Sequence, residues 1–205
     1  LANFILGFFA MRIARKAVSE TVDNDLLDKA EDTAEIIDGK ISSLLQFLEG
    51  IARAPVLRDS NVTSDEKALY LKKEADFNHE ILLLSYADLS GNMYTYGDKT
   101  INVSGQDWFV LGKQGKNSVS EPFVSSLDGN FIMAVGIPVI GENNQVMSAI
   151  CATIDGLYLS RDIEDIVVGK TGYCYILNPE GTVIAHRDES IVRNFGNSQK
   201  RAEKD

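Results

Sequence analysis

Apolar residues recur along the first quarter of the chain with the spacing of a long helix. Between Met11 and Ala54 the sequence contains no proline, and Pro55 then interrupts the pattern. Within this stretch, apolar positions alternate four and three residues apart, which is the period of a coiled-coil seam. We expect one helix over residues 11–54, roughly 66 Å long. The positions of this heptad seam are Ala30, Ala34, Ile37, Ile41, Leu44, Leu48 and Ile51.

Two uses of this helix fit the pattern. The heptad seam packs along a sheet of the same chain, or it also forms a dimer stalk that continues out of a membrane. A helix of this length exceeds what a compact domain of this size needs for its own core. Further apolar residues widen the face beyond one seam, which favours the second use. They are Leu26, Leu27, Ile36 and Leu45.

The start of the sequence is apolar and uncharged over residues 1–10, and Arg12, Arg15 and Lys16 follow it. Such a segment is too short to span a bilayer, which needs about 20 residues. It is either the end of a transmembrane helix or an apolar helix start that docks on a partner. A signal peptide has its basic residues before the apolar core, which is the opposite order.

After Pro55 the apolar pattern becomes strand-like. Helices are still expected over residues 64–77 and 106–113, but the other apolar runs are short and separated by turns rich in glycine, asparagine and aspartate. Strands joined by such turns form hairpins, so the sheet is expected to be antiparallel, with about five strands. The expected strands are residues 81–87, 93–96, 119–125, 131–140 and 146–154.

A shorter unit follows this sheet. A helix is expected over residues 156–168, and strands over 173–177 and 182–186 enclose a turn at 178–181. This order of strand, polar turn and strand repeats that of residues 82–96, as a weak internal duplication. Two strands alone make a marginal sheet, so the second unit is expected to be incomplete in this sequence.

The predicted fold class is therefore α+β. A long N-terminal helix is followed by two modules with antiparallel sheets in series, the second of them truncated. The expected divisions of the chain are residues 1–57, 58–155 and 156–205.

Composition and motifs narrow the function classes. Twenty basic against 30 acidic residues give a formal charge of −10, which disfavours nucleic acid as a partner. The two cysteines, Cys151 and Cys174, exclude a disulfide-rich scaffold and a CxxC metal site, and they are expected to be small apolar residues. His186, at a strand end, is expected to be structural. The sequence has no nucleophile elbow, HExxH motif or phosphate-binding loop, so we expect no catalytic residue, metal or cofactor.

Four motifs carry a resemblance to a known family. They are VSGQDWF at 103–109, SEPFVSSLDGNFIMAVGIPV at 120–139, AICATID at 149–155 and GKTGYCYILNPEGTVIAHRD at 169–188. Together these motifs resemble the double Cache domain, an extracytoplasmic sensor domain. Bacterial and archaeal chemoreceptors, sensor histidine kinases and diguanylate cyclases carry such domains.

The resemblance implies two PAS-like modules on the outer side of the cell membrane, between two transmembrane helices. Residues 58–155 would be the membrane-distal, ligand-binding module, and 156–205 a linking helix with part of the membrane-proximal module. Residues 1–57 would be the end of a membrane helix and a stalk, through which a homodimer could form. A methyl-accepting chemotaxis protein is the first expectation for the whole receptor, with a histidine kinase or a diguanylate cyclase as alternatives.

The resemblance also implies ligand-binding residues. In family members that bind amino acids, an arginine is followed two and three residues later by tryptophan and tyrosine, and an aspartate closes the last distal strand. Here Trp108 and Asp155 match, and Phe109 matches in part. Gln106 replaces the arginine, and Ile101 replaces an aromatic residue five positions before it. The remaining candidates are Asp107, Phe123 and Ser125.

Replacing arginine by Gln106 changes the expected ligand. Arginine binds a carboxylate with two charge-assisted hydrogen bonds. Losing that charge weakens the binding free energy of a carboxylate ligand by about 1.5–3 kcal/mol. An aromatic wall at Trp108 and a carboxylate at Asp155 suit an amine or a quaternary ammonium group, and Gln106 suits a neutral polar metabolite. The expected ligand is therefore an amine, an amino-acid-like molecule or a neutral polar metabolite.

Structural alternatives stay open for these residues. Trp108 could be a core residue, and Asp155 could cap the following helix. The chain could also be an ectodomain that binds a partner protein and no small molecule.

Overall fold

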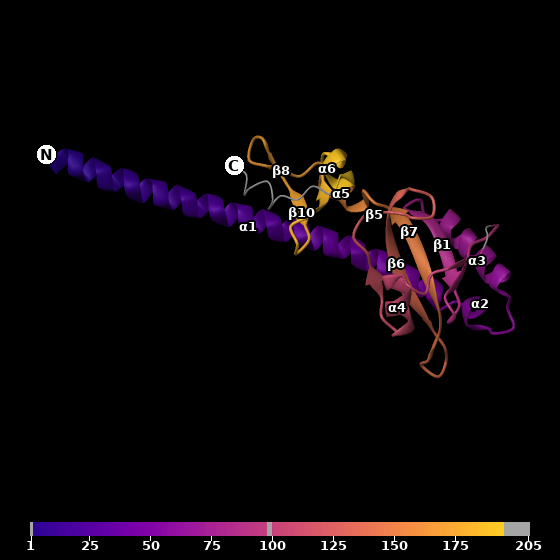
Figure 1. Cartoon of the computed structure of the whole chain (residues 1–205). Helices are drawn as coiled ribbons and strands as arrows, with labels where there is room; N and C mark the ends of the chain where they lie inside the picture. Colours follow the sequence, from indigo (N-terminus) through magenta and orange to yellow (C-terminus); the bar gives the residue numbers. More distant parts are fainter. Residues whose placement is uncertain (1, 98–99, 195–205) are drawn as a thin grey trace.

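The structure is a computed structural model, which describes residues 2–97 and 100–194. Helix α1 (Ala2–Ala52) contains 51 residues and extends far beyond the rest of the chain toward its N-terminus (Figure 1). It begins earlier than the expected residue 11 and ends two residues before the expected 54. None of the helices in the described part of the chain combines the length and the apolar character that crossing a membrane requires.

The heptad seam of α1 packs against this chain's own modules. Leu44, Leu48 and Ile51 are at most 5 % exposed and belong to the main hydrophobic core, and Ile37 and Ile41 pack at its edge. This confirms the expectation that the helix packs along its own sheet. Other large apolar side chains of α1 stay exposed. They are Met11, Val18, Val22, Leu26, Leu27, Ile36 and Phe47.

Two helices follow α1, namely α2 (Pro55–Arg58) and α3 (Ser64–Asp76). A capping box begins α3, because the Glu66 amide donates to the Thr63 hydroxyl at 3.3 Å and the Thr63 amide donates to the Glu66 carboxylate at 2.9 Å. The helix expected over residues 64–77 is therefore confirmed. Together, α1 and α3 cover one face of the main sheet.

The main sheet has seven strands in the order β3-β2-β1-β7-β6-β4, and β5 also pairs with β6. Every pairing in it is antiparallel, as expected. The strands are β1 (Ile81–Ala87), β2 (Asn92–Tyr94), β3 (Ile101–Asn102), β4 (Ser118–Val119), β5 (Phe123–Val124), β6 (Phe131–Ile140) and β7 (Val146–Asp155).

The expected strand over residues 119–125 is split into β4 and β5, so the estimate of about five strands was too low. Pro122 lies between the two pieces and cannot donate to a ladder. The Ser120 hydroxyl accepts the Ala134 amide at 2.8 Å in place of a backbone carbonyl. Strand β3, which contains only two residues, had no recognisable alternation in the sequence.

The two faces of this sheet have different neighbours. Alternate residues of β6 and β7, such as Val135 and Ala152, belong to the main core with α1. The residues between them, such as Ala134 and Cys151, form a second cluster with helix α4 (Asp107–Lys113). The ligand-binding candidates on α4 therefore lie on the side of the sheet opposite α1.

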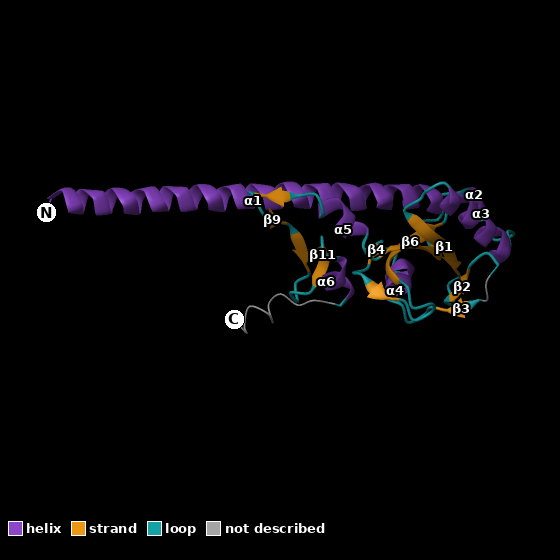
Figure 2. Ribbon diagram, turned by 90° about the horizontal axis from the view of Figure 1, so that it is seen from above, coloured by secondary structure: helices purple, strands orange, loops and turns teal. Residues whose placement is uncertain are grey.

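The second unit is small and lies beside the middle of α1 (Figure 2). The helix expected over 156–168 ends early, at Ile163, and a short strand follows it. The strand expected over 173–177 is interrupted at Cys174, whose sulfur lies 3.7 Å from the Thr33 hydroxyl of α1. Two separate two-stranded sheets result, β8-β9 and β10-β11. The elements are α5 (Tyr158–Ile163), β8 (Val167–Val168), β9 (Gly172–Tyr173), β10 (Tyr175–Leu177), β11 (Val183–His186) and α6 (Glu189–Arg193).

A polar network joins the two units to α1. The Lys40 ammonium lies 2.7 Å from the Asp162 carboxylate of α5 and 3.3 Å from Glu80, just before β1. It also lies 4.4 Å from the ring centre of Tyr158, whose hydroxyl donates to Glu80 at 3.2 Å. Burial and the neighbouring Glu80 raise the pKa of Tyr158, so this phenol stays protonated and remains a donor.

Truncating the heptad seam inside the core should destabilise the fold. We expect Leu48→Ala to lower the free energy of unfolding by about 2–5 kcal/mol, because it leaves a cavity at a fully buried position. Leu27→Ala, on the same helix but 61 % exposed, should change it by less than about 0.5 kcal/mol. Urea unfolding followed by circular dichroism measures both values, and equal losses would contradict the packing described above.

Removing Lys40 should also destabilise the fold. Lys40→Met leaves the half-buried Asp162 without a positive charge beside it. We expect this to lower the free energy of unfolding by about 1–3 kcal/mol. Adding Asp162→Asn should recover part of this loss, because it removes the more buried of the two carboxylates that Lys40 neutralises. Lys16→Met removes only an exposed pair with Glu20 and should have almost no effect. Chemical unfolding of the three variants tests this order.

Candidate ligand-binding site

A cavity of about 210 Å³ opens on the α4 side of the main sheet. This distal cavity combines aromatic, aliphatic and polar side chains from strands, α4 and loops, as ligand sites do. It is lined by Leu83, Ser85, Met93, Ile101, Asn102, Val103, Gln106, Trp108, Phe123, Ser125, Ser126, Leu127, Asp128, Ile132, Ala134, Cys151 and Thr153.

Trp108 lies in the first turn of α4 and is 8 % exposed. A glycine in the sheet allows it to lie this close. A Cβ atom at Gly136 of β6 would meet the Trp108 Cβ at 2.9 Å and the Ser118 hydroxyl at 2.7 Å. The missing side chain at Gly136 therefore fixes how deeply α4 and Trp108 sit against the sheet.

Four of the seven candidates from the sequence line the distal cavity together. They are Gln106, Trp108, Phe123 and Ser125. Phe109 is not among the lining residues but is buried in the cluster beneath α4, where it meets the edge of Trp108 at 5.9 Å between ring centres. Asp107, the first residue of α4, is exposed and also does not line the cavity.

Asp155 lies on the cavity face of β7, since it shares the alternation of Cys151 and Thr153, but it is not among the residues lining the cavity. One of its oxygens accepts the Leu157 amide at 2.9 Å, and the other pairs with Arg161 at 3.0 Å. The carboxylate thus orders the turn before α5 and does not cap the helix, whose N-cap residue is Leu157. A direct contact between Asp155 and a ligand stays a prediction.

The structure adds lining residues that sequence reasoning missed. Ser85 and Thr153 could have been found from strand alternation once the pairing of β1 with β7 was known. Asp128 had a weaker signal, because its Asp-Gly-Asn sequence indicated only a hairpin turn. It is nevertheless the one charged residue among the described residues that line the cavity.

The electrostatics of the cavity are set by few groups. The Ser125 hydroxyl and the Asn130 amide donate to Asp128 and lower the pKa of its carboxyl group, which is ionised at neutral pH. Burial raises the pKa of Cys151 to about 12, so its thiol is neutral. The described part of the chain contains no cluster of side chains suited to hold a metal ion.

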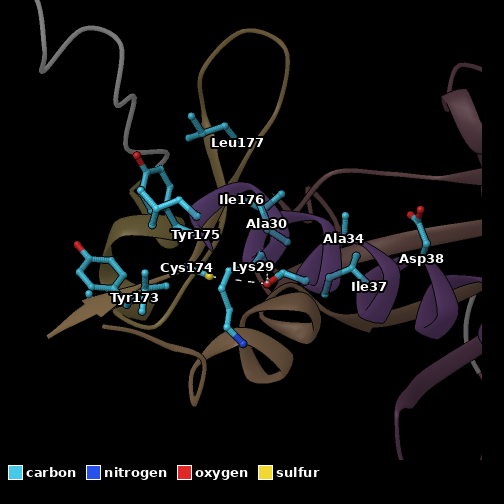
Figure 3. A pocket seen from close by; sticks show the side chains of 14 residues that line it. Lys29, Ala30, Ala34, Ile37, Asp38, Tyr173, Cys174, Tyr175, Ile176 and Leu177 are labelled. Carbon is cyan, nitrogen blue, oxygen red and sulfur yellow. Dashed lines mark hydrogen bonds between the residues drawn. The ribbon is translucent and has the colours of Figure 1, made fainter. Parts of the chain in front are cut away.

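A larger groove, of about 690 Å³, lies between α1 and the small hairpins of the second unit (Figure 3). Ala30, Ala34 and Ile37 form its helix side, and Tyr173 to Leu177 form the other. Its walls are mostly apolar, and the Thr33 hydroxyl is already bonded to the Lys29 carbonyl at 2.7 Å. The smaller distal cavity has the convergent polar groups that orient a small ligand, so it is the better candidate site.

The arrangement of a long helix, an antiparallel sheet and a cavity behind a short helix is that of a PAS-like module. Its sequence matches the model of the Cache domain, in the double form dCache_1, over residues 11–203. The chain belongs to this family.

Curated relatives are methyl-accepting chemotaxis proteins. The chain is 25 % identical over 187 residues to TlpA of Bacillus subtilis and 20 % identical over 183 residues to PscA of Pseudomonas syringae pv. tomato. The alignments cover 86 % and 87 % of this chain but only 28 % of each relative. The chain therefore spans less than a third of the length of these receptors.

Solved structures confirm the fold. The ligand-binding domain of the chemoreceptor CtaA from Pseudomonas fluorescens, in complex with L-isoleucine, superimposes with a TM-score of 0.73 at 18 % identity, covering 93 % of this chain and 78 % of that one. The ligand-binding domain of PctC from Pseudomonas aeruginosa, in complex with GABA, gives 0.67 at 19 % identity, with 84 % and 78 % covered.

Adding a side chain at Gly136 should displace Trp108. We expect Gly136→Ala to lower the free energy of unfolding by about 1–3 kcal/mol and to shift the tryptophan emission, since α4 must move off the sheet. Gly105→Ala lies close to Trp108 in sequence, but a Cβ there meets nothing within 4 Å. Emission spectra of the two variants measure the difference, and an unshifted spectrum in Gly136→Ala would contradict the close contact.

Proposed function

We propose that this chain is the extracytoplasmic ligand-sensing domain of a methyl-accepting chemotaxis protein. The observation that carries the proposal is the distal cavity, which a Cache fold encloses between the sheet and α4 and which Trp108 and Phe123 line. The curated relatives are methyl-accepting chemotaxis proteins, and the similar solved domains hold small amino-acid-like molecules. In this proposal the domain binds a ligand and catalyses no reaction.

The proposed ligand is a small polar metabolite, either an amine or a neutral molecule. Its size is limited by a cavity of about 210 Å³, smaller than the 300–1,000 Å³ that drug-sized ligands occupy. Gln106 offers an uncharged amide where amino-acid sensors of the family carry an arginine. A ligand carboxylate therefore lacks the bidentate cation that it has in those relatives.

In the proposed receptor, binding changes the position of α1 relative to the sheet or to a second copy of α1. Flanking transmembrane helices would anchor the domain in the cell membrane, and a homodimer would form through the exposed apolar residues of α1. A ligand shifts the equilibrium between two positions of α1 only if it binds the two states with different affinities. A histidine kinase or a diguanylate cyclase would use the same sensor domain with another output.

Trp108, the only tryptophan of the chain, reports directly on the distal cavity. We expect a ligand found by thermal shift among amines, amino acids, purines and small carboxylates also to change the Trp108 fluorescence. At a hundredfold excess over Kd, binding stabilises the folded state by about 2.7 kcal/mol, which a melting curve detects. Gln106→Ala should weaken binding several-fold, whereas Gln114→Ala, exposed at the end of α4, should not.

Two results would contradict this proposal. Binding without any change in Trp108 fluorescence, and with equal affinity in Gln106→Ala, would place the ligand outside the distal cavity. A domain that melts cooperatively but binds nothing in the panel would favour an ectodomain that recognises a partner protein.

A further inference from the structure

The distal cavity carries a negative charge that is not balanced within its walls. Of its described lining residues only Asp128 is charged at neutral pH, and none is a lysine, arginine or histidine. The remaining polar groups are neutral amides and hydroxyls, such as Gln106 and Thr153. An anionic ligand would therefore meet one like charge and no opposite charge.

Asp128 is oriented by its neighbours without being neutralised by them. Its carboxylate oxygens accept the Ser125 hydroxyl, the Asn130 amide at 3.1 Å and the Asn130 side chain at 2.5 Å, all of them neutral donors. These bonds hold the carboxylate in the turn between β5 and β6, at the exposed rim of the cavity. None of these donors carries a charge, so the negative charge of Asp128 remains available to attract a cation.

Asp155 is in the opposite situation. The Arg161 guanidinium lies 3.0 Å from one of its oxygens and supplies a positive charge, while the Leu157 amide occupies the other oxygen. A ligand ammonium would have to compete with the Arg161 guanidinium for the charge of Asp155. The free negative charge of this site is thus on Asp128.

We propose that Asp128 is the anionic anchor of the distal cavity and that its ligand is a small organic cation without a carboxylate. This inference rests on the proposed sensor function. The ammonium group lies at the rim beside Asp128, and the uncharged body of the ligand lies against Trp108 and Phe123.

The test compares molecules of one shape and different charge. Choline is a cation, 3,3-dimethylbutan-1-ol is its neutral isostere, and glycine betaine carries a carboxylate on the same trimethylammonium group. Ethanolamine, ethylene glycol and glycine form the matching set for a primary amine. We expect at least one of the two cations, choline or ethanolamine, to bind at least tenfold more tightly than the neutral molecule and the carboxylate-bearing molecule of its own set. Trp108 fluorescence and calorimetry measure these affinities.

Three aspartate variants locate the anchor. Asp128→Asn should weaken binding of the cation about tenfold or more and remove the preference over its neutral isostere. Asp107→Asn, exposed at the start of α4, and Asp155→Asn should change the affinity less than threefold. Each of the three variants must first be shown to melt like the wild-type protein. For Asp155→Asn a small loss of stability is expected at the turn into α5.

The outcomes separate this inference from the proposed function. If no cation of the two sets binds, or if betaine or glycine binds as tightly as the cation, the assignment of an organic cation is wrong. Full cation affinity in Asp128→Asn, with loss in Asp155→Asn, would place the anchor at the end of β7 instead. In each of these cases, another ligand in the wider panel that changes Trp108 fluorescence would still support a sensor domain.

Discussion

The rest of the structure depends on the burial of one face of α1 against the main sheet. Leu48 is fully buried, Leu44 and Ile51 nearly so, and they meet side chains of β6 and β7 in the main core. Burying each such side chain contributes about 1.5–3 kcal/mol, whereas an isolated helix gains little from its own hydrogen bonds in water. This contact holds a 51-residue helix to a sheet face that α3 covers only in part.

The same two strands build the candidate site on their other face. Successive residues of a strand point to opposite sides, so Cys151 and Thr153 line the cavity while Ile150 and Ala152 belong to the core with α1. A ligand in the cavity and the long helix therefore act on one pair of strands from opposite sides. This arrangement places the proposed binding event one sheet thickness away from the helix that leads toward the membrane in the proposed receptor.

The sequence was sufficient to predict the elements whose periodicity is strong. The bounds of β1 and β6 agree with the expected residues, and the heptad seam correctly identified the buried side of α1. Prediction failed where one residue overrides a pattern, as when Pro122 splits an apolar run into β4 and β5. It also failed for strands of two residues, such as β3, which are too short to show an alternation and exist because they pair with a neighbouring strand.

The candidate site was only partly predictable, for a physical reason. Gln106, Trp108, Phe123 and Ser125 were found because they lie at positions that the family motif marks. Whether an aspartate is available to a ligand depends instead on its partners in three dimensions, which one sequence does not show.

Asp155 matches the motif but is paired with Arg161, six residues further along the chain. That pair gives Asp155 a structural role, because it joins the end of β7 to α5. Helix α5 in turn contacts α1 through Asp162 and Lys40, and its Ser160 hydroxyl accepts the His186 amide of β11 at 3.3 Å. A short path of covalent and ionic contacts thus runs from the strand that lines the cavity to both α1 and the second unit. The aspartate that the motif marks belongs to this path, and the negative charge that faces the cavity belongs to Asp128. In this chain, the negative charge at the cavity and the ion pair that joins the end of β7 to α5 are carried by two different carboxylates.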